Sequence, residues 1–292
     1  MTPGTGPANT AVGNSETTTE HPSVTVVTIV FNDLEGLQAT ATTVTEQDYP
    51  NIEHLIVDGA STDGTADWLA SPDAEHPGRR IISEPDDGIY DAMNKGLRNA
   101  TGHFIMFLNA RDIFVRPDAI TNLVGAAKAQ GRTWAFGYVD VVNEDNEVVR
   151  PLRMGEYTFD RQLWHKERLA HQAVLAPRER LVELGGFDES FKITADFDLS
   201  LRLAHKYPPA QLRQVIINYD DTGFSTQHWA QAVWEIRRAR DKLFGTSPVG
   251  WTVRRLRVMG IISLFWGRGK GKAIAKKLLP EQLFKSVILR RS

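Results

Sequence analysis

Residues Asp86 to Asp112 read DDGIYDAMNKGLRNATGHFIMFLNARD and carry the clearest structural signal of the chain. The pattern predicts an acidic loop, a helix over residues 89–100 that stops at Gly102, and an apolar strand over residues 103–108. That strand runs directly into Asp112. A buried strand that ends in a carboxylate is typical of the ligand-binding edge of a parallel sheet.

The residues before this stretch repeat the alternation of strand and helix. Runs rich in β-branched residues predict strands over 23–31, 52–58 and 79–83. Apolar residues at helical spacing after Leu34 predict one helix, and a shorter helix is expected near Trp68. This order predicts an α/β fold with a doubly wound, mostly parallel sheet.

The second half of the chain has a mixed pattern. We expect strands over 133–142, 147–150, 172–175 and 214–219, helices over 178–184 and 195–207, and a helical segment from 227 onward. The predicted organisation is a disordered tail (1–22), two halves of one domain (23–115 and 116–225) and a basic helical C-terminal segment (226–292).

Composition limits the class of protein. The chain has 292 residues and no cysteine, which excludes disulfides and thiolate metal sites and suits a reducing compartment. Residues 1–22 lack an apolar core, so we expect a disordered tail and not a signal peptide, and a cytoplasmic location. The net charge of −2 conceals a basic end: residues 251–292 carry eleven Lys and Arg and the single acid Glu281.

Polar and acidic residues gather at the predicted carboxyl ends of the strands. They are Asn32, Asp58, Asp86, Asp87 and the segment Asn109 to Asp112, and the aromatic Phe31 lies beside them. The chain has neither G-x-G-x-x-G after its first strand nor a G-x-x-x-x-G-K-[ST] loop, so two common phosphate-binding loops are missing. Carboxylate and amide oxygens are preferred by Mg²⁺ and Mn²⁺, which indicates a metal–diphosphate site.

Six segments together resemble the family 2 glycosyltransferases of the GT-A fold, and most closely the bacterial enzymes that extend surface polysaccharides or glycolipids. The resemblance covers residues 23–225. The segments are VTVVTIVFND (24–33), IVDGASTDGT (56–65), DDGIYDAMNKGLRNATG (86–102), FLNARD (107–112), HQAVL (171–175) and GGFDESFKITADFDLSLRL (185–203).

The resemblance implies transfer of a sugar, with inversion, from a nucleotide-diphosphate sugar to a hydroxyl of a glycan or lipid-linked acceptor. Asp196 matches the general base, and Asp112 matches the last acid of the metal-binding D-x-D-type motif. Arg111 stands where many members have an acid or a glycine. Residues 23–115 would bind the nucleotide sugar, and residues 116–225 would bind the acceptor. The other residues that would bind the nucleotide sugar are Phe31, Asn32, Asp58, Asp87, Tyr90, Asn94, Lys95 and Asn109. His171 and Gln172 would lie near the acceptor or the diphosphate.

Several of these residues have an ordinary structural interpretation as well. Asp58 could hydrogen-bond the loop that follows it, and Asp196 could complement the dipole of the helix it begins. Tyr90 could stack on a substrate or pack, while Asn94 could be an interior helix residue and Lys95 a solvated one. Asp198 is expected to be structural.

Two other functions remain open at this point. A sugar nucleotidyltransferase would also need a metal and a related α/β domain, but it usually has a basic, glycine-rich loop after the first strand. A non-catalytic protein that binds a nucleotide or carbohydrate is the other alternative. The basic segment 251–292 suits an anionic membrane surface, and it could instead pack on the body or form an oligomer interface. Nucleic acid is disfavoured because the body is acidic.

Overall fold

The computed structural model describes residues 21–143, 146–164, 169–220 and 229–244. The chain separates into two units, Met1–Ala232 and Val233–Ser292, which are described separately. The predictions for residues 1–20 and for the basic segment 251–292 lie outside the described residues. Within the described residues, none of the helices is both long and apolar enough to cross a lipid bilayer.

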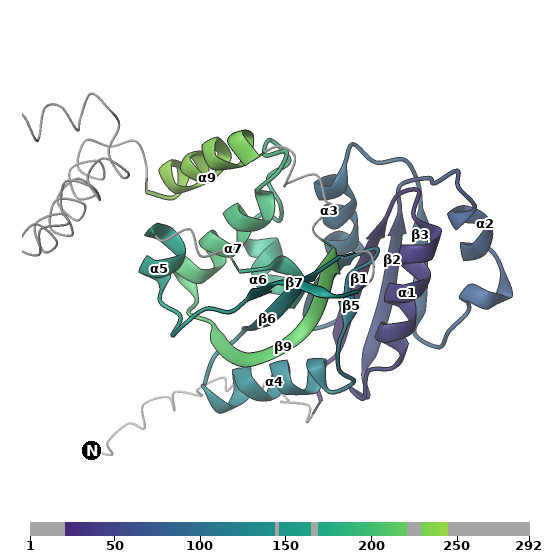
Figure 1. The fold of residues 1–292 in the computed structure, drawn as a ribbon, viewed down its shortest axis with the longest axis horizontal. Coiled ribbons are helices and arrows are strands. Elements are labelled where there is room, and N and C mark those ends of the chain that lie inside the picture. Colours follow the sequence, from purple (N-terminus) through teal and green to yellow (C-terminus); the bar gives the residue numbers. More distant parts are fainter. Residues whose placement is uncertain (1–20, 144–145, 165–168, 221–228, 245–292) are drawn as a thin grey trace, which may run out of the picture. The chain divides into compact units, whose positions relative to one another are not determined.

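The first half of unit 1 alternates strands and helices, as the sequence predicts (Figure 1). Its elements are β1 (Val24–Val30), α1 (Leu34–Thr45), β2 (Ile52–Asp58), α2 (Thr65–Leu69), the 3-10 turn η1 (Pro72–Ala74), β3 (Arg79–Ser83), α3 (Ile89–Asn99) and β4 (Phe104–Asn109). All seven residues of β1 are buried, which explains why its sequence is β-branched without alternation.

The register of these strands aligns their carboxyl ends. Strand β1 pairs in parallel with both β2 and β4, and β2 pairs in parallel with β3. Val30 lies opposite Asp58, Asp58 lies opposite Ser83, and Ile29 lies opposite Asn109. The loops that follow the four strands therefore meet at one edge of the sheet, where open α/β sheets bind their ligands.

The second half of unit 1 adds mixed strands to the same sheet. Its order is β3-β2-β1-β4-β8-β6-β9-β5, with β7 paired to β6. Strand β8 is antiparallel to both β4 and β6, while β9 runs parallel to β6. Figure 1 shows α4 on one side of the β6–β9 region and α6 with α7 on the other. The elements are β5 (Ile113–Phe114), α4 (Ala119–Ala129), β6 (Ala135–Val142), β7 (Val148–Leu152), α5 (Phe159–Trp164), η2 (His171–Ala173), β8 (Val174–Pro177), α6 (Arg178–Glu183), α7 (Ala195–Lys206) and β9 (Ala210–Asp220).

The structure corrects the sequence interpretation at several elements. The strand expected over 172–175 is a 3-10 turn, η2, followed by β8. Helix α4, helix α5 and strand β5 were not predicted, and β9 begins earlier than expected, at Ala210. Helix α4 carries Thr, Asn and Gly residues that weaken its helical signal, but its buried face, with Ile120 and Leu123, packs in the main core.

Helix α9 (Trp229–Phe244) agrees with the helical segment predicted from residue 227 onward, within the residues described. It contains an ion pair at helical spacing between Arg237 and Asp241, whose side chains are 3.8 Å apart. The helix spans the division between the two units.

Candidate active site

The loops after β1 and β2 are joined by Asn32, which has a left-handed backbone with φ of 52°. Its N–H donates to Ser61 Oγ at 2.7 Å, and its Oδ1 accepts from the N–H of Thr62 at 2.7 Å. The preceding side chain, Phe31, is 64% exposed. An exposed aromatic ring held at a strand end suits stacking on a flat ligand group.

Asp58 is fully buried at the end of β2. Its Oδ1 accepts from the hydroxyl of Ser61 at 2.5 Å, and its Oδ2 accepts from the hydroxyl of Ser83 at 2.6 Å. The carboxylate thus joins the loop after β2 to the end of β3, which is its ordinary structural interpretation. Contact of Asp58 with a base or sugar stays a prediction, and it would need these bonds to rearrange.

Gly59 lies between an aromatic ring and a carboxylate. A Cβ atom at this position would lie 2.5 Å from Asp86 Oδ2 and 3.1 Å from the ring of Phe31. Only glycine therefore lets these two side chains flank the strand end. The carboxylate of Asp86 also accepts from the N–H of Gly88 at 2.9 Å, while Asp87 beside it is exposed.

Two residues of α3 that are predicted to bind the nucleotide sugar, Asn94 and Lys95, form hydrogen bonds within the protein. Asn94 donates from Nδ2 to Phe187 O at 2.9 Å and accepts at Oδ1 from Phe187 N–H at 2.9 Å. Lys95 donates to the carbonyl of Pro85 and pairs with Glu84 at 3.2 Å. Asn94 therefore stabilises the loop before α7, and Lys95 stabilises the acidic loop before α3. A ligand contact by either residue would break these bonds and stays a prediction.

The segment after β4 forms a tight turn around Asp112. The carboxylate of Asp112 is 3% exposed and accepts from the N–H of Asn109 at 2.6 Å. Its other oxygen lies 3.4 Å from Gln172 Nε2. The side-chain oxygen of Asn109 is buried and has no hydrogen-bond partner. A buried amide oxygen without a partner, three residues before this carboxylate, is an acceptor that a cation or a hydrogen-bond donor could satisfy.

Arg111 turns away from this segment toward helix α1. Its guanidinium forms a two-bond fork with Asp33, with both N–O distances at 2.8 Å. Asp33 also caps α1 by accepting from the N–H of Gly36 at 3.1 Å. A Cβ atom at Gly36 would lie 2.5 Å from the Arg111 side chain, so the fork needs glycine there. The predicted pairing of Arg111 with a diphosphate competes with this contact.

Asp196 lies in the first turn of helix α7, between two side chains from other segments. The hydroxyl of Tyr90 donates to its Oδ1 at 3.3 Å, and His171 Nδ1 lies 3.5 Å from its Oδ2. The Asp196 side chain is 25% exposed. Burial and the charge of Asp196 raise the pKa of Tyr90 well above its usual value, so its hydroxyl keeps its proton.

The 3-10 turn η2 connects the two acidic centres. His171 lies beside Asp196, and the next residue, Gln172, lies beside Asp112. The turn thus brings together residues from both halves of the domain that the sequence analysis singled out separately. Sequence reasoning did not find the partners Asp33, Ser61, Ser83 and Phe187, because a Ser or an Asp in a loop carries no distinctive pattern.

The donor set fits a hard divalent cation that completes its coordination with a ligand. The described part of the chain contains no group of three or more His, Cys, Asp or Glu side chains that could hold a metal by themselves. The orphaned Asn109 oxygen and the Asp112 carboxylate are oxygen donors of the preferred type. Mg²⁺ is usually held by one or two carboxylates plus substrate phosphates, so this small set is sufficient.

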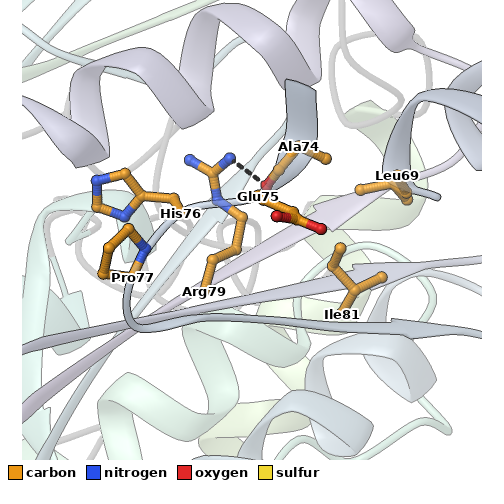
Figure 2. Close-up of a pocket in the computed structure, with 7 residues that line it drawn as sticks. All are labelled: Leu69, Ala74, Glu75, His76, Pro77, Arg79 and Ile81. Carbon is orange, nitrogen blue, oxygen red and sulfur yellow. Dashed lines mark hydrogen bonds between the residues drawn. The ribbon is translucent and has the colours of Figure 1, made fainter. Parts of the chain in front are cut away.

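Two hollows in the surface lie elsewhere. The first, of about 530 Å³, is lined by residues of η1 and β3, and Figure 2 shows Arg79 crossing it to the carbonyl of Ala74. The second, of about 460 Å³, shares Glu75, His76 and Arg79 with it. Both adjoin the amino end of β3, whereas the candidate site gathers at the carboxyl ends of the strands. They are not part of the candidate site.

Comparison with known proteins identifies the family. Residues 25–179 match the Glycosyl transferase family 2 domain. An uncharacterized glycosyltransferase of Mycobacterium tuberculosis is 36% identical over 229 residues, which cover 76% of this chain and 85% of that protein. A PGL/p-HBAD biosynthesis glycosyltransferase of Mycobacterium bovis is 30% identical over 183 residues, covering 62% of this chain and 69% of the relative. The chain belongs to glycosyltransferase family 2 and is a glycosyltransferase.

Solved structures confirm the predicted GT-A-like fold. TarS of S. aureus, in complex with UDP-GlcNAc, has a TM-score of 0.63 and 14% identity, covering 77% of this chain and 67% of that chain. The mannosyltransferase PcManGT of Pyrobaculum calidifontis, in complex with GDP-Man and Mn²⁺, has a TM-score of 0.57 and 21% identity, covering 93% and 80%. At these identities the likeness concerns the fold alone.

Proposed function

We propose that this glycosyltransferase moves a sugar, with inversion, from a nucleotide-diphosphate sugar to a hydroxyl of a cell-envelope glycan or glycolipid. The observation that carries the proposal is the arrangement around η2. One residue of this turn contacts Asp196, the proposed general base, and the next contacts Asp112, the proposed metal ligand. The proposed base for the attacking hydroxyl and the proposed ligand of the metal that binds the leaving diphosphate are thereby connected through one short turn.

Residues 23–115 form the proposed nucleotide-sugar half. The exposed ring of Phe31 would stack on the base, and Asn32 with the loop after β2 would shape the ribose site. Support comes from the structural neighbours, which bind UDP-GlcNAc in one case and GDP-Man with Mn²⁺ in the other. Asp86, across Gly59 from Phe31, is well placed to accept from a base or ribose donor.

The acceptor hydroxyl is a weak nucleophile, so the reaction needs a base within hydrogen-bond reach. Asp196 is the partly exposed carboxylate that would take the proton as the hydroxyl attacks the anomeric carbon. Asn109 and Asp112 would hold Mn²⁺ or Mg²⁺, which when bound stabilises the negative charge that gathers on the departing diphosphate. His171 and Gln172 would lie between the acceptor and the diphosphate.

Attack from the face opposite to the leaving group, assisted by a single base, inverts the anomeric centre. A retaining double displacement would need a second carboxylate as nucleophile, positioned against the anomeric carbon close to the first. Asp198, the nearest acid in sequence, is buried and bound to Arg202 at 2.8 Å, which supports its expected structural role and argues against it as that nucleophile. Inversion is therefore the proposed outcome.

The proposed acceptor class rests on the relatives and on the charge of the chain. One relative is a PGL/p-HBAD biosynthesis glycosyltransferase, and a second is a putative teichuronic acid biosynthesis glycosyltransferase of Bacillus subtilis, 34% identical over 92 residues. The eleven basic residues of segment 251–292 would bring the enzyme to the anionic inner face of the plasma membrane, where a lipid-linked acceptor would be met.

The test is the variant Asp196→Asn, which keeps the shape of the side chain and removes its basicity. We expect release of nucleoside diphosphate from the nucleotide sugar to fall by at least 10²-fold, in line with the usual contribution of a general base. Affinity for the nucleoside diphosphate, measured by calorimetry, should stay within about twofold, since an uncharged isostere leaves the donor half intact. Unchanged turnover would remove Asp196 from the reaction, and formation of diphosphate from a nucleoside triphosphate would support a nucleotidyltransferase instead.

A further inference from the structure

We propose that Tyr90 and His171 are positioning residues that hold the Asp196 carboxylate from two sides and fix its orientation. The proposal rests on the proposed function of Asp196 and extends it. Tyr90 belongs to α3 and His171 to η2, so the two donors come from opposite halves of the domain. Each contacts a different oxygen of the same carboxylate.

Tyr90 is a rigid donor toward Asp196. Its side chain is 8% exposed, and its ring stacks on Phe187 with centroids 5.9 Å apart and an interplanar angle of 20°. The ring of Phe187 in turn packs edge-on against Phe107 of β4. A hydroxyl mounted on a packed ring loses little entropy when it donates, and it constrains Oδ1 of Asp196 at 3.3 Å.

His171 supplies the second donor, and its surroundings select its tautomer. Nδ1 faces Asp196 Oδ2 at 3.5 Å, whereas Nε2 is buried without a hydrogen-bond partner among the described residues. A proton on Nδ1 meets the carboxylate, but a proton on Nε2 would be a buried donor with no acceptor. Because an unsatisfied buried donor is costly, the neutral ring carries its proton on Nδ1.

Asp198 differs from Asp196 in its surroundings. Asp198 stands two positions further on α7, is 2% exposed and is bound by Arg202 within the protein. The Asp196 side chain is 25% exposed, and each of its two oxygens is contacted by a side chain from another segment. These contacts orient the carboxylate while its side chain stays partly accessible.

Several charged or polar groups on the elements packed against α7 have partners at other places. On α6, Arg180 and Glu183 pair with each other, and Glu183 also pairs with Lys206 at the far end of α7. Helix α5 carries Asp160 and Arg161, and its Gln162 contacts Ser200 of α7 at 3.1 Å. Glu189, in the loop before α7, accepts from Asn94 at 2.7 Å. Tyr90 and His171, in contrast, both contact the Asp196 carboxylate.

The kinetic test uses Tyr90→Phe and His171→Leu in the full-length chain, each of which removes one donor. Turnover is followed as nucleoside diphosphate released from UDP-GlcNAc or GDP-mannose. We expect kcat to fall about tenfold and the KM for the nucleotide sugar to stay within about twofold, because one polar contact that orients the Asp196 carboxylate is lost. The acidic limb of the rate–pH profile should move up by about one pH unit, since a carboxylate that loses a donor binds its proton more tightly.

Two matched variants separate positioning from folding. Tyr157→Phe removes a half-buried tyrosine hydroxyl that donates to Gln162 Oε1 at 2.7 Å, and it should leave the pH profile unchanged. His171→Asn restores a donor near the position of Nδ1 and should recover most of the lost kcat. A pH profile that does not move in folded Tyr90→Phe and His171→Leu proteins would overturn the proposal.

A second measurement is independent of turnover. In full-length protein with ¹⁵N-labelled histidine at pH 8, long-range ¹H–¹⁵N spectra report the tautomer of each ring, and His171→Asn identifies the relevant signal. We expect the Nδ1–H form for His171. The Nε2–H form would place a lone pair against the Asp196 carboxylate and would overturn the proposal, even if Asp196→Asn abolishes transfer as the proposed function requires.

Discussion

His171 Nδ1 lies 3.5 Å from Asp196 Oδ2, and its neighbour Gln172 lies 3.4 Å from Asp112. Both contacts come from the 3-10 turn η2, which leads directly into β8. At β8 the pairing in the sheet changes from parallel to antiparallel. A displacement of this turn would move the proposed base and the proposed metal ligand together. The proposed reaction centre is therefore linked by a short turn that leads directly into β8, the strand that pairs with β4.

The first prediction concerns Asp112. If its carboxylate holds a divalent cation, Asp112→Asn should weaken Mn²⁺-dependent binding of UDP or GDP by at least tenfold, because a carboxylate–metal contact is replaced by a weaker amide oxygen. Binding without metal should differ little between variant and wild type. Calorimetry with and without Mn²⁺ measures both quantities.

The matched control for this variant is Asp73→Asn, which removes an exposed carboxylate in η1. It should bind nucleotide as the wild type does. If wild-type protein binds UDP or GDP equally well without metal, the assignment of Asp112 is wrong.

How far these contacts could be predicted differs between the two halves of the chain. The strands of the parallel half, residues 23–115, could be predicted because the buried ones are dense in β-branched residues. Polar residues also mark the ends of these strands, as Asp58 does for β2. The hydrogen bonds that those residues form could not be predicted from the sequence. The Asp58–Ser83 bond and the Tyr90–Asp196 bond join positions with no shared local pattern, so only the fold brings them together.

Arg111 illustrates the same limit. The sequence placed it in the metal-binding segment and predicted a role near the diphosphate, whereas its side chain forms a fork with Asp33 at the start of α1. That outcome depends on Gly36, which leaves room for the fork and lies far away in sequence. Asp196 was found from family resemblance, since its position in a first helical turn has an equally good structural explanation.

The second prediction follows from the Arg111–Asp33 fork. Because the guanidinium is already paired, we expect Arg111→Ala to lower nucleoside diphosphate affinity less than Asp112→Asn does, by about twofold. The side chains are 48% and 22% exposed, so a double-mutant cycle should give a coupling energy below about 1 kcal/mol. A tenfold loss of affinity in Arg111→Ala would instead show that the arginine leaves Asp33 to bind the diphosphate.

The third prediction concerns the basic segment 251–292. With its eleven basic residues, it should bind the full-length protein to vesicles that contain phosphatidylglycerol, and the bound fraction should fall as salt rises. Vesicles of phosphatidylcholine alone serve as the control. Flotation of the chain ending at residue 250 is the decisive comparison, since equal binding by both forms would refute the membrane role of the segment.

The fourth prediction is a pH dependence of stability that originates at His54, far from the proposed reaction. Its ring is buried, with Nε2 at 2.9 Å from Thr28 Oγ1 and Nδ1 accepting from Arg79 at 3.3 Å. Burial, with a further contribution from the charge of Arg79, lowers the pKa of His54 to about 3. The folded protein therefore keeps this ring neutral over a range where the unfolded chain binds a proton.

The sign of the effect follows from that difference. Between the ordinary pKa of 6.5 and the folded pKa of about 3, the unfolded state binds more protons, so the free energy of unfolding falls as the pH falls. From pH 7.5 to 5.5 the loss from this one group should be about 1.4 kcal/mol. Urea unfolding at both pH values should show a smaller loss in His54→Gln, which has no titratable ring, and the full loss in the exposed-residue control His103→Asn. An equal pH dependence in wild type and His54→Gln would contradict the assignment.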